Sequence, residues 1–144
     1  MNAATRLILC ACLSFTPLAT ADDESASWRI VNYWSEWCAP CRIEIPIFNA
    51  LSLELQSSGI KVVGVNFDED PREVTLDIAD ELGVEFPTLT QPEVDELALR
   101  PPDVMPTTYI LSPDNEVMAK LIGMQSRESL LGELERLGLT VNSQ

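Results

Sequence analysis

Apolar residues form two nearly unbroken runs in the first half of the chain, Trp28 to Trp34 (WRIVNYW) and Lys61 to Phe67 (KVVGVNF). Both runs are rich in β-branched and aromatic residues, a composition typical of strands that are buried on both faces. Between the two runs, apolar residues recur at the spacing of a helix, at Ile43, Ile47, Leu51 and Leu55. Two buried strands joined by one helix predict a right-handed, parallel βαβ unit.

The second half of the chain contains shorter elements with clear boundaries. A proline-containing turn at 113–115 separates two extended runs, Thr107–Ser112 and Glu116–Gly123, and predicts a β-hairpin. The other expected elements are a helix from about Pro71 to Leu82 with Asp70 as its N-cap, an extended piece at Phe86–Thr90, a brief helix from about Pro92 to Leu99, and a final helix that Ser126 caps. Together these elements predict a one-domain α/β protein, with a mixed sheet of four or five strands and helices on both faces.

Composition narrows the function classes. The 144 residues are enough for one domain, and 23 acidic against 9 basic residues give a formal net charge of −14. Such a charge repels nucleic acid and anionic lipid, so we expect no nucleic-acid partner. The chain has no histidine, which removes the commonest general base and the commonest zinc ligand. Any chemistry must therefore use cysteine or carboxylate.

The first 21 residues have the pattern of a secretory signal peptide. Arg6 ends a short basic region, Leu7 to Phe15 form an apolar stretch, and Ala19-Thr20-Ala21 matches the small-x-small pattern of a cleavage site. Cleavage near Ala21 would leave residues 22–144 as an exported domain, periplasmic or otherwise outside the cytosol. An uncleaved membrane anchor and a lipoprotein with a lipidated Cys12 are the alternatives.

Signal removal takes away Cys10 and Cys12, so that Cys38 and Cys41 remain as a pair two residues apart. Tetrahedral zinc needs four ligands, and a c-type haem motif needs histidine directly after the second cysteine, where this chain has Arg42. A purely structural disulfide would close a loop too short to stabilise the fold much. The spacing therefore favours a dithiol that exchanges electrons with other thiols and disulfides.

The predicted place of this pair at a helix start gives the two cysteines different roles. Free N–H groups and the macrodipole at a helix N-terminus favour a thiolate, so Cys38 is the predicted nucleophile. Cys41, one turn inward, can attack the mixed disulfide formed at Cys38 and release the reduced partner. Glu44 follows three residues later on the same helical face, where a buried carboxyl could take up or give a proton.

The Trp37-Cys38-Ala39-Pro40-Cys41-Arg42 motif is followed, in order, by Glu44-x-Pro46, VVGVNFDEDP and MPTTYIL. From about Trp28 to Leu137, the chain resembles the thioredoxin-like thiol–disulfide oxidoreductases of the exported TlpA/ResA type, which include the CcmG-like reductants. The resemblance implies a thioredoxin-like fold. The chain departs from the family in its short segment before Trp28, which is too short for the usual N-terminal β-hairpin, and in the LRPPDV sequence that precedes MPTTYIL.

The resemblance also implies roles for single residues. Pro106 would form a cis peptide bond facing the dithiol, and Glu44 occupies the place of a glutamate that tunes the thiols of the family. Asn32 stands where cytoplasmic thioredoxin has a buried aspartate. Trp37 is expected to pack beside the motif and shield it. The residues expected to contact a client are Trp37, Ala39, Pro40, Met105, Pro106 and Thr107.

These observations predict an exported thiol–disulfide oxidoreductase that reduces disulfides of periplasmic client proteins, for example in cytochrome c maturation. Its expected partners are clients with disulfides or thiols and a membrane thiol electron donor, and we expect a monomer without cofactor or metal. The alternative is a Cu(I)-handling protein, because soft thiolates beside Met105 could bind Cu(I).

Overall fold

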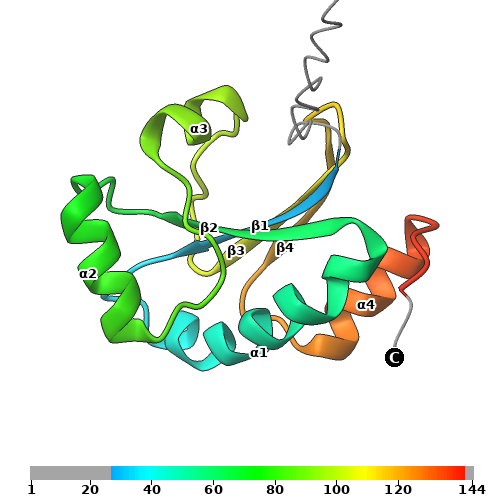
Figure 1. Ribbon diagram of the computed structural model, residues 1–144, viewed down its shortest axis with the longest axis horizontal. Coiled ribbons are helices and arrows are strands. Elements are labelled where there is room, and N and C mark those ends of the chain that lie inside the picture. The colour runs from blue at the N-terminus through cyan, green and yellow to red at the C-terminus, as the bar shows by residue number, and fades with distance from the viewer. Residues whose placement is uncertain (1–26, 142–144) are drawn as a thin grey trace, which may run out of the picture.

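The computed structural model describes residues 27–141, which form a mixed four-stranded sheet and its covering helices (Figure 1). The strand order is β2-β1-β3-β4. Strand β1 runs parallel to β2 and antiparallel to β3, and β3 pairs with β4 as an antiparallel hairpin. The elements are β1 (Trp28–Trp34), α1 (Ala39–Leu55), η2 (Gln56–Ser58), β2 (Ile60–Asn66), α2 (Arg72–Leu82), α3 (Gln91–Glu96), β3 (Thr107–Leu111), β4 (Val117–Ile122) and α4 (Arg127–Arg136).

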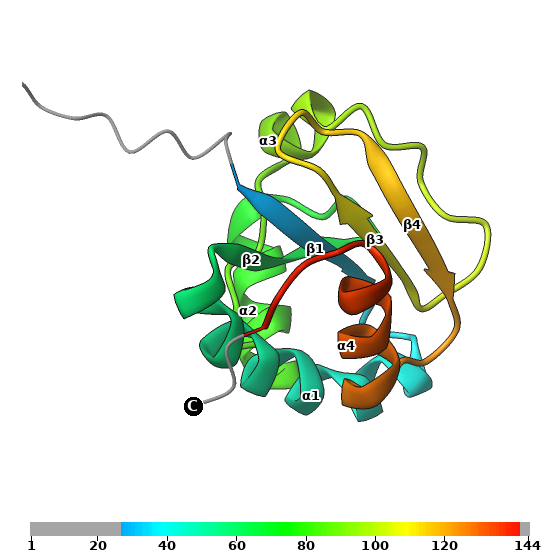
Figure 2. The same ribbon diagram turned by 90° about the vertical axis from the view of Figure 1, so that its right-hand side faces the viewer.

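This arrangement confirms the predicted α/β class, the parallel βαβ unit and the hairpin. The extended piece expected at Phe86–Thr90 is reduced to an isolated parallel bridge between Gly64 and Thr88, so the sheet has four strands. Helices α1 and α4 cover one face of the sheet and α3 lies over the other, as Figures 1 and 2 show. We call these the α1 face and the α3 face.

Strand β1 supplies side chains to both hydrophobic cores, because successive residues of a strand point to opposite faces. Ile30 and Trp34 are fully buried in the larger core, which includes Phe48 of α1 and Leu130 of α4. The smaller core on the α3 face is formed by Val31, Tyr33, Val63, Val65, Leu97, Tyr109 and Leu111. The prediction that the WRIVNYW strand is buried on both faces is therefore confirmed.

The buried face of α1 differs from the predicted one. Ile43 is 63% exposed and Ile47 is only partly buried, whereas Glu44 and Phe48 are fully buried. The prediction that Ile43 and Ile47 face the core was wrong for the first turns of the helix, because the Glu44 carboxylate occupies one of the buried positions. Hydrogen bonds from two other segments make the burial of this carboxylate possible, and helical spacing cannot anticipate them.

Two of the predicted helix starts also shift. Asp70 is not the N-cap of α2: Pro71 is, without a side-chain cap, and the Asp70 carboxylate instead accepts a hydrogen bond from Asn66 Nδ2 at 3.0 Å. Helix α3 begins earlier and ends earlier than expected, because Thr90 caps its start and Ala98 adopts a left-handed conformation with φ 50°. The cap at Ser126 is confirmed.

The predicted signal peptide and the lipidation alternative fall on residues 1–26, outside the described residues, and stay predictions. Within residues 27–141, no helix combines the length and the apolar composition that crossing a bilayer requires.

Candidate active site

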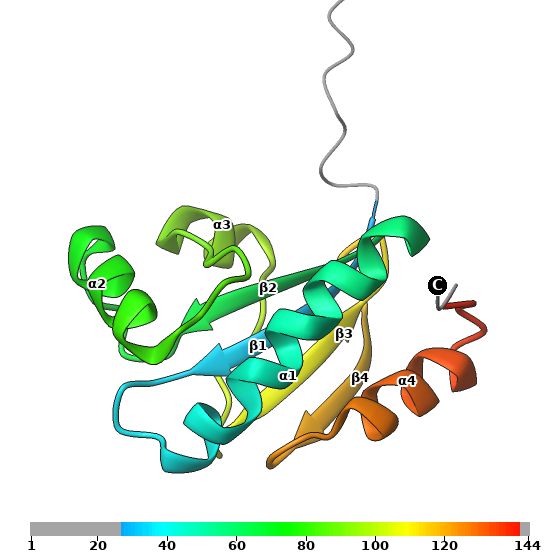
Figure 3. The same cartoon turned by 60° about the horizontal axis from the view of Figure 1, so that its bottom comes forward.

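Helix α1 begins directly after the short turn that leaves β1, as Figure 3 shows, and Cys38 stands at its start. The Cys38 N–H donates to the carbonyl of Ser35 at 3.2 Å, and Cys38 is the N-cap residue of the helix. Its Sγ accepts a hydrogen bond from the backbone N–H of Cys41 at 3.3 Å. Pro40 occupies the first turn, where a backbone N–H would have no helical partner. The predicted position of the pair at a helix N-terminus is confirmed.

Cys38 and Cys41 are joined by a disulfide, and they differ in accessibility. Cys38 is 8% exposed, whereas Cys41 is fully buried in the core of the α1 face. Cys38 lines a cavity of about 520 Å³, the dithiol cavity, whose walls are Ser35, Trp37, Cys38, Ala39, Pro40, Phe67, Asp68 and Met105. An incoming thiol or disulfide therefore meets Cys38 first.

A hydrogen-bonded serine holds the turn before the dithiol. Ser35 is 5% exposed, and its hydroxyl donates to the Asp68 carboxylate at 2.6 Å while it accepts from the Trp37 N–H at 3.3 Å. These bonds join the end of β1 to the loop after β2. Sequence reasoning did not single out Ser35 or Asp68, because the contact joins positions 33 residues apart.

The segment opposite the dithiol contains a cis peptide bond between Met105 and Pro106, as the resemblance implied. Met105 lines the dithiol cavity. Thr107 is fully buried, and its hydroxyl donates to the Val104 carbonyl at 2.7 Å. The Thr107 side chain thus faces the interior and holds this loop in place, while Met105 faces the cavity.

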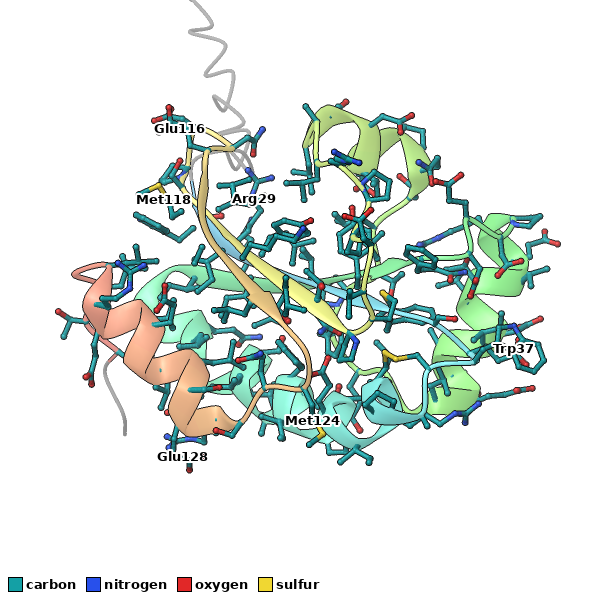
Figure 4. The ribbon with its side chains drawn as sticks, turned by 180° about the vertical axis from the view of Figure 1, so that it is seen from behind. Arg29, Trp37, Glu116, Met118, Met124 and Glu128 are labelled. Carbon is teal, nitrogen blue, oxygen red and sulfur yellow. A yellow bond between two sulfur atoms is a disulfide. The ribbon has the colours of Figure 1, made fainter. Side chains whose placement is uncertain are left out.

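Trp37 does not shield the dithiol as expected. Its side chain is 82% exposed and projects from the surface in Figure 4. The interior position is taken by Trp34, the last residue of β1, which is fully buried over Gly64: a Cβ added at Gly64 would lie 2.6 Å from Trp34 Nε1. Trp37 belongs to the turn, where its backbone N–H donates to the Ser35 hydroxyl, and it lines the dithiol cavity.

Glu44 is fully buried on the α1 face, one turn beyond Cys41. Its carboxylate accepts hydrogen bonds from Asn32 Nδ2 at 2.8 Å and from the backbone N–H of Gln125 at 2.9 Å. Loss of solvent raises the pKa of Glu44 above its ordinary value, and the two hydrogen bonds oppose this effect because they favour the charged form. The site thus places a titratable carboxyl within the same helical segment as the dithiol.

Residues 11–120, most of the chain, match the AhpC/TSA family. The chain belongs to this family.

Several relatives of this AhpC/TSA protein are similar over most of its length. Thiol-disulfide oxidoreductase ResA of Bacillus thuringiensis (strain Al Hakam) is 26% identical over 107 residues, which cover 74% of this chain and 61% of the relative, so the chain spans less than two thirds of that protein. A secreted thiol-disulfide isomerase from Corynebacterium glutamicum is 26% identical, with a TM-score of 0.60 and coverage of 74% of this chain and 68% of that chain.

Another solved structure confirms the fold alone. A thiol:disulfide interchange protein DsbE from Chlorobium tepidum, described as putative, has a TM-score of 0.64 at 23% identity and covers 81% of this chain and 82% of its own. The solved structures confirm the thioredoxin-like fold, and the ResA relative confirms the resemblance to the ResA type. Sequence reasoning did not identify Gln125 as a partner of Glu44, because that contact joins residues 81 positions apart.

Proposed function

We propose that this protein is a thiol–disulfide oxidoreductase that reduces disulfides in exported client proteins. The observation that carries the proposal is the asymmetry of the pair: Cys38 lies at a helix N-terminus and lines an open cavity, and Cys41 is buried behind it. Relatives named as thiol-disulfide oxidoreductase and thiol-disulfide isomerase support the same chemistry.

The reaction begins with both cysteines reduced. The Cys38 thiolate attacks one sulfur of a client disulfide, an S–S bond forms between Cys38 and that sulfur, and the second client sulfur leaves as a thiolate. Cys41 then loses its proton and attacks Cys38 Sγ. The mixed disulfide breaks, and the client sulfur that was bound to Cys38 leaves as a thiolate. Both client thiolates take up protons from solvent, and the protein keeps the Cys38–Cys41 disulfide. Two electrons have moved from the protein to the client.

Glu44 is the proposed acceptor for the proton that Cys41 releases. It is the buried carboxyl one turn from Cys41, and its raised pKa brings it nearer to the pH at which thiols exchange. Asn32 and the N–H of Gln125 hold both carboxylate oxygens, so they fix the orientation of this proton acceptor. Ala39, Pro40 and Met105 line the cavity in which the client sulfur would lie, and the loop at Pro106 and Thr107 supports that wall.

The charges around the dithiol support a reducing role. A strongly oxidising dithiol has a stabilised thiolate in its reduced form. Here the helix N-terminus favours the Cys38 thiolate, but Glu44 behind the pair and Asp68 in the cavity wall are acidic and oppose it. We therefore propose a reductant, which needs a thiol electron donor at the membrane to restore its dithiol.

Export and the class of client rest on sequence. The predicted signal peptide would direct residues 22–144 out of the cytosol, and one similar protein is described as secreted. Resemblance to the CcmG-like reductants makes cytochrome c maturation the proposed process, with monomeric action on client cysteines.

The test is a single-turnover assay with the reduced protein and insulin as disulfide substrate. We expect one insulin disulfide to be reduced for each protein oxidised at Cys38 and Cys41, and a reduction potential more negative than about −200 mV on equilibration with glutathione. Cys38→Ser is the inactive control. If the reduced protein kept both thiols on exposure to insulin, the proposal would be contradicted. A reduction potential near that of strong oxidants, about −120 mV, would make the protein an oxidant of its clients.

A further inference from the structure

A second cavity lies beside the dithiol cavity, on the α3 face of the sheet. It has a volume of about 400 Å³ and is bounded by the ends of β1 and β2, by α3 and by the segment that follows α3. We call it the side pocket. Phe67 lines both the side pocket and the dithiol cavity, so that one side chain separates them. Phe67 itself is 37% exposed.

Tyr33 lines the side pocket, and its hydroxyl is enclosed in the pocket wall. The side chain is 2% exposed, and its hydroxyl has no hydrogen-bond partner among the described residues. Burial, together with Tyr109 and Glu69, raises the pKa of Tyr33 to about 12, so the phenol is neutral at physiological pH. An unpartnered buried hydroxyl costs free energy, and a ligand recovers this free energy when the wall opens enough for its N–H to reach the neutral phenol oxygen.

The walls of the side pocket carry more negative than positive charge. Glu69 and Asp95 contribute carboxylates and Arg100 contributes one guanidinium. The Asp95 carboxylate accepts a hydrogen bond from Gln91 Nε2 at 2.9 Å, which leaves further lone pairs on its oxygens. Carboxylates and a phenol oxygen together form a set of acceptors, and this set fits a donor-rich cation better than an anion or an apolar group.

The backbone of the side pocket is unusual at two places. Glu69 and Ala98 have φ values of 54° and 50°, and each lines the pocket. Among the described residues, the other non-glycine residue with positive φ is Asn115, in the β3–β4 hairpin. A left-handed conformation is unfavourable for alanine and glutamate, and the loops on both sides of this pocket adopt it.

We infer that the side pocket binds a cationic side chain, lysine or arginine, of the client segment whose cysteine reacts at Cys38. The inference rests on the proposed function, because it names what that function recognises beyond the client sulfur. The shared wall at Phe67 sets the reach: an extended segment advances about 3.3 Å per residue, so the cation lies roughly two to four residues from the client cysteine.

The experiment uses short peptides of alanine and glycine, each with one cysteine oxidised to the peptide homodimer. Lysine, norleucine or glutamate is placed at successive positions on either side of the cysteine, and the rate constant for reduction by the reduced protein is measured. We expect lysine to raise this rate about fivefold over norleucine at one or two adjacent positions on one side, and glutamate to lower it.

Variants separate the side pocket from the general acidity of the chain. The double variant Glu69→Gln/Asp95→Asn should bring the lysine-to-norleucine ratio close to one, and Tyr33→Phe should lower it in part. The matched control Glu73→Gln/Asp77→Asn removes two exposed carboxylates of α2 and should keep the ratio. Equal rates for lysine and norleucine in the wild type, or a ratio that survives the double variant, would overturn the inference.

A second measurement tests binding in the side pocket independently of the proposed function. The same peptides with serine in place of cysteine are titrated into the oxidised protein and followed by NMR. We expect the lysine peptide to shift the amide signals of residues 66–69 and 95–100 more than the norleucine peptide does. If these shifts occur but no peptide is reduced, the side pocket stands and the proposed function fails. If peptides are reduced but lysine produces no selective shift, the side pocket is refuted alone.

Discussion

Asn32 and Tyr33 are neighbours on β1, yet they place their polar groups in opposite environments. Asn32 points to the α1 face, where its Nδ2 donates to Glu44 at 2.8 Å and to Thr108 at 3.2 Å, while its Oδ1 has no partner among the described residues. Tyr33 points to the α3 face, where its ring stacks edge-on against Tyr109 and its hydroxyl has no partner in the described part of the chain. The difference fits the two roles proposed above, a hydrogen-bonded reaction centre on the α1 face and a recognition pocket on the α3 face.

The comparison follows from the alternation of side chains along a strand. Since β1 is central and buried on both faces, a one-residue step moves a side chain from the dithiol side to the side pocket. The α1 face is packed and its buried carboxylate is held by two donors. The α3 face has the shorter helix and a smaller core, and it retains a cavity. Mutations on the α1 face should therefore lower the free energy of unfolding more than mutations on the α3 face.

The largest change in the free energy of unfolding should come from adding a side chain at Gly64, on the packed α1 face. A Cβ there would lie 2.6 Å from Trp34 Nε1 and 2.8 Å from the Phe86 ring, so Gly64→Ala should lower the free energy of unfolding by about 2–3 kcal/mol. Gly132→Ala in α4 is the matched control, because a Cβ there meets nothing within 4 Å. Urea denaturation should show that this control is stabilised by about 0.5–1 kcal/mol. If Gly64→Ala and Gly132→Ala changed the free energy of unfolding by the same amount, the α1 face would not be tightly packed.

Asn32→Ala should cost somewhat less, about 2 kcal/mol, because it removes one of the two donors to a buried carboxylate. The control is Asn49→Ala, whose side chain also bridges two segments, through Gly83 and Glu85, but at the surface. We expect a loss of about 0.5 kcal/mol for that variant. A similar cost at both positions would show that Glu44 does not depend on Asn32.

Glu44→Gln tests the pH dependence of the α1 face. The pKa of Glu44 is raised above 4.5 in the folded protein, so the folded state binds this proton more tightly than the unfolded chain. The stability that comes from the protonated carboxyl is complete below about pH 4.5 and is lost as the pH rises through the raised pKa. Relative to the variant, the wild type should therefore lose stability across that window. A difference between the two proteins that does not vary with pH would contradict the assignment.

The same variant should change the thiol chemistry. Removal of a negative charge near the dithiol makes a thiolate easier to form, so alkylation of the reduced pair should shift to lower pH in Glu44→Gln. Disulfide exchange should slow if Glu44 accepts the Cys41 proton. Alkylation profiles and exchange rates that superimpose on those of the wild type would remove Glu44 from the mechanism.

The smallest effect is expected on the α3 face. Tyr33→Phe deletes a buried hydroxyl without a partner among the described residues, so it should leave the free energy of unfolding unchanged or raise it by up to about 1 kcal/mol. Tyr109→Phe is the matched control, since the Tyr109 hydroxyl donates to the Arg100 carbonyl at 3.1 Å, and its loss should cost about 1 kcal/mol. A large loss for Tyr33→Phe would reveal a structural partner and weaken the case for recognition.

Much of the fold follows from local patterns in the sequence. The β1 strand, the hairpin and the Ser126 cap each depend on residues close together in the chain, and each was predicted within about two residues of its position. The dithiol at the start of α1 was predicted for the same reason, because the turn and the helix start adjoin it.

The remaining features depend on contacts that no local pattern encodes. Glu44 was expected to be partly buried, but its donors Asn32 and Gln125 come from other segments, and without them Ile43 and Ile47 looked like the buried positions. The turn that carries Trp37 is held by Ser35, whose hydroxyl is bonded to Asp68, 33 positions away in the chain. The side pocket joins β1, the loop after β2 and the segment after α3, and nothing in their separate sequences indicates a cavity.

The central claim is that Cys38 reacts with the client and Cys41 resolves the product, and a trapping experiment tests it most directly. Reduced Cys41→Ser and Cys38→Ser variants are each mixed with a disulfide-bonded peptide, and adducts are measured by intact-mass spectrometry over time. We predict that Cys41→Ser accumulates a stable one-to-one mixed disulfide through Cys38, while Cys38→Ser forms almost none because Cys41 is fully buried. Faster adduct formation by Cys38→Ser would contradict the account.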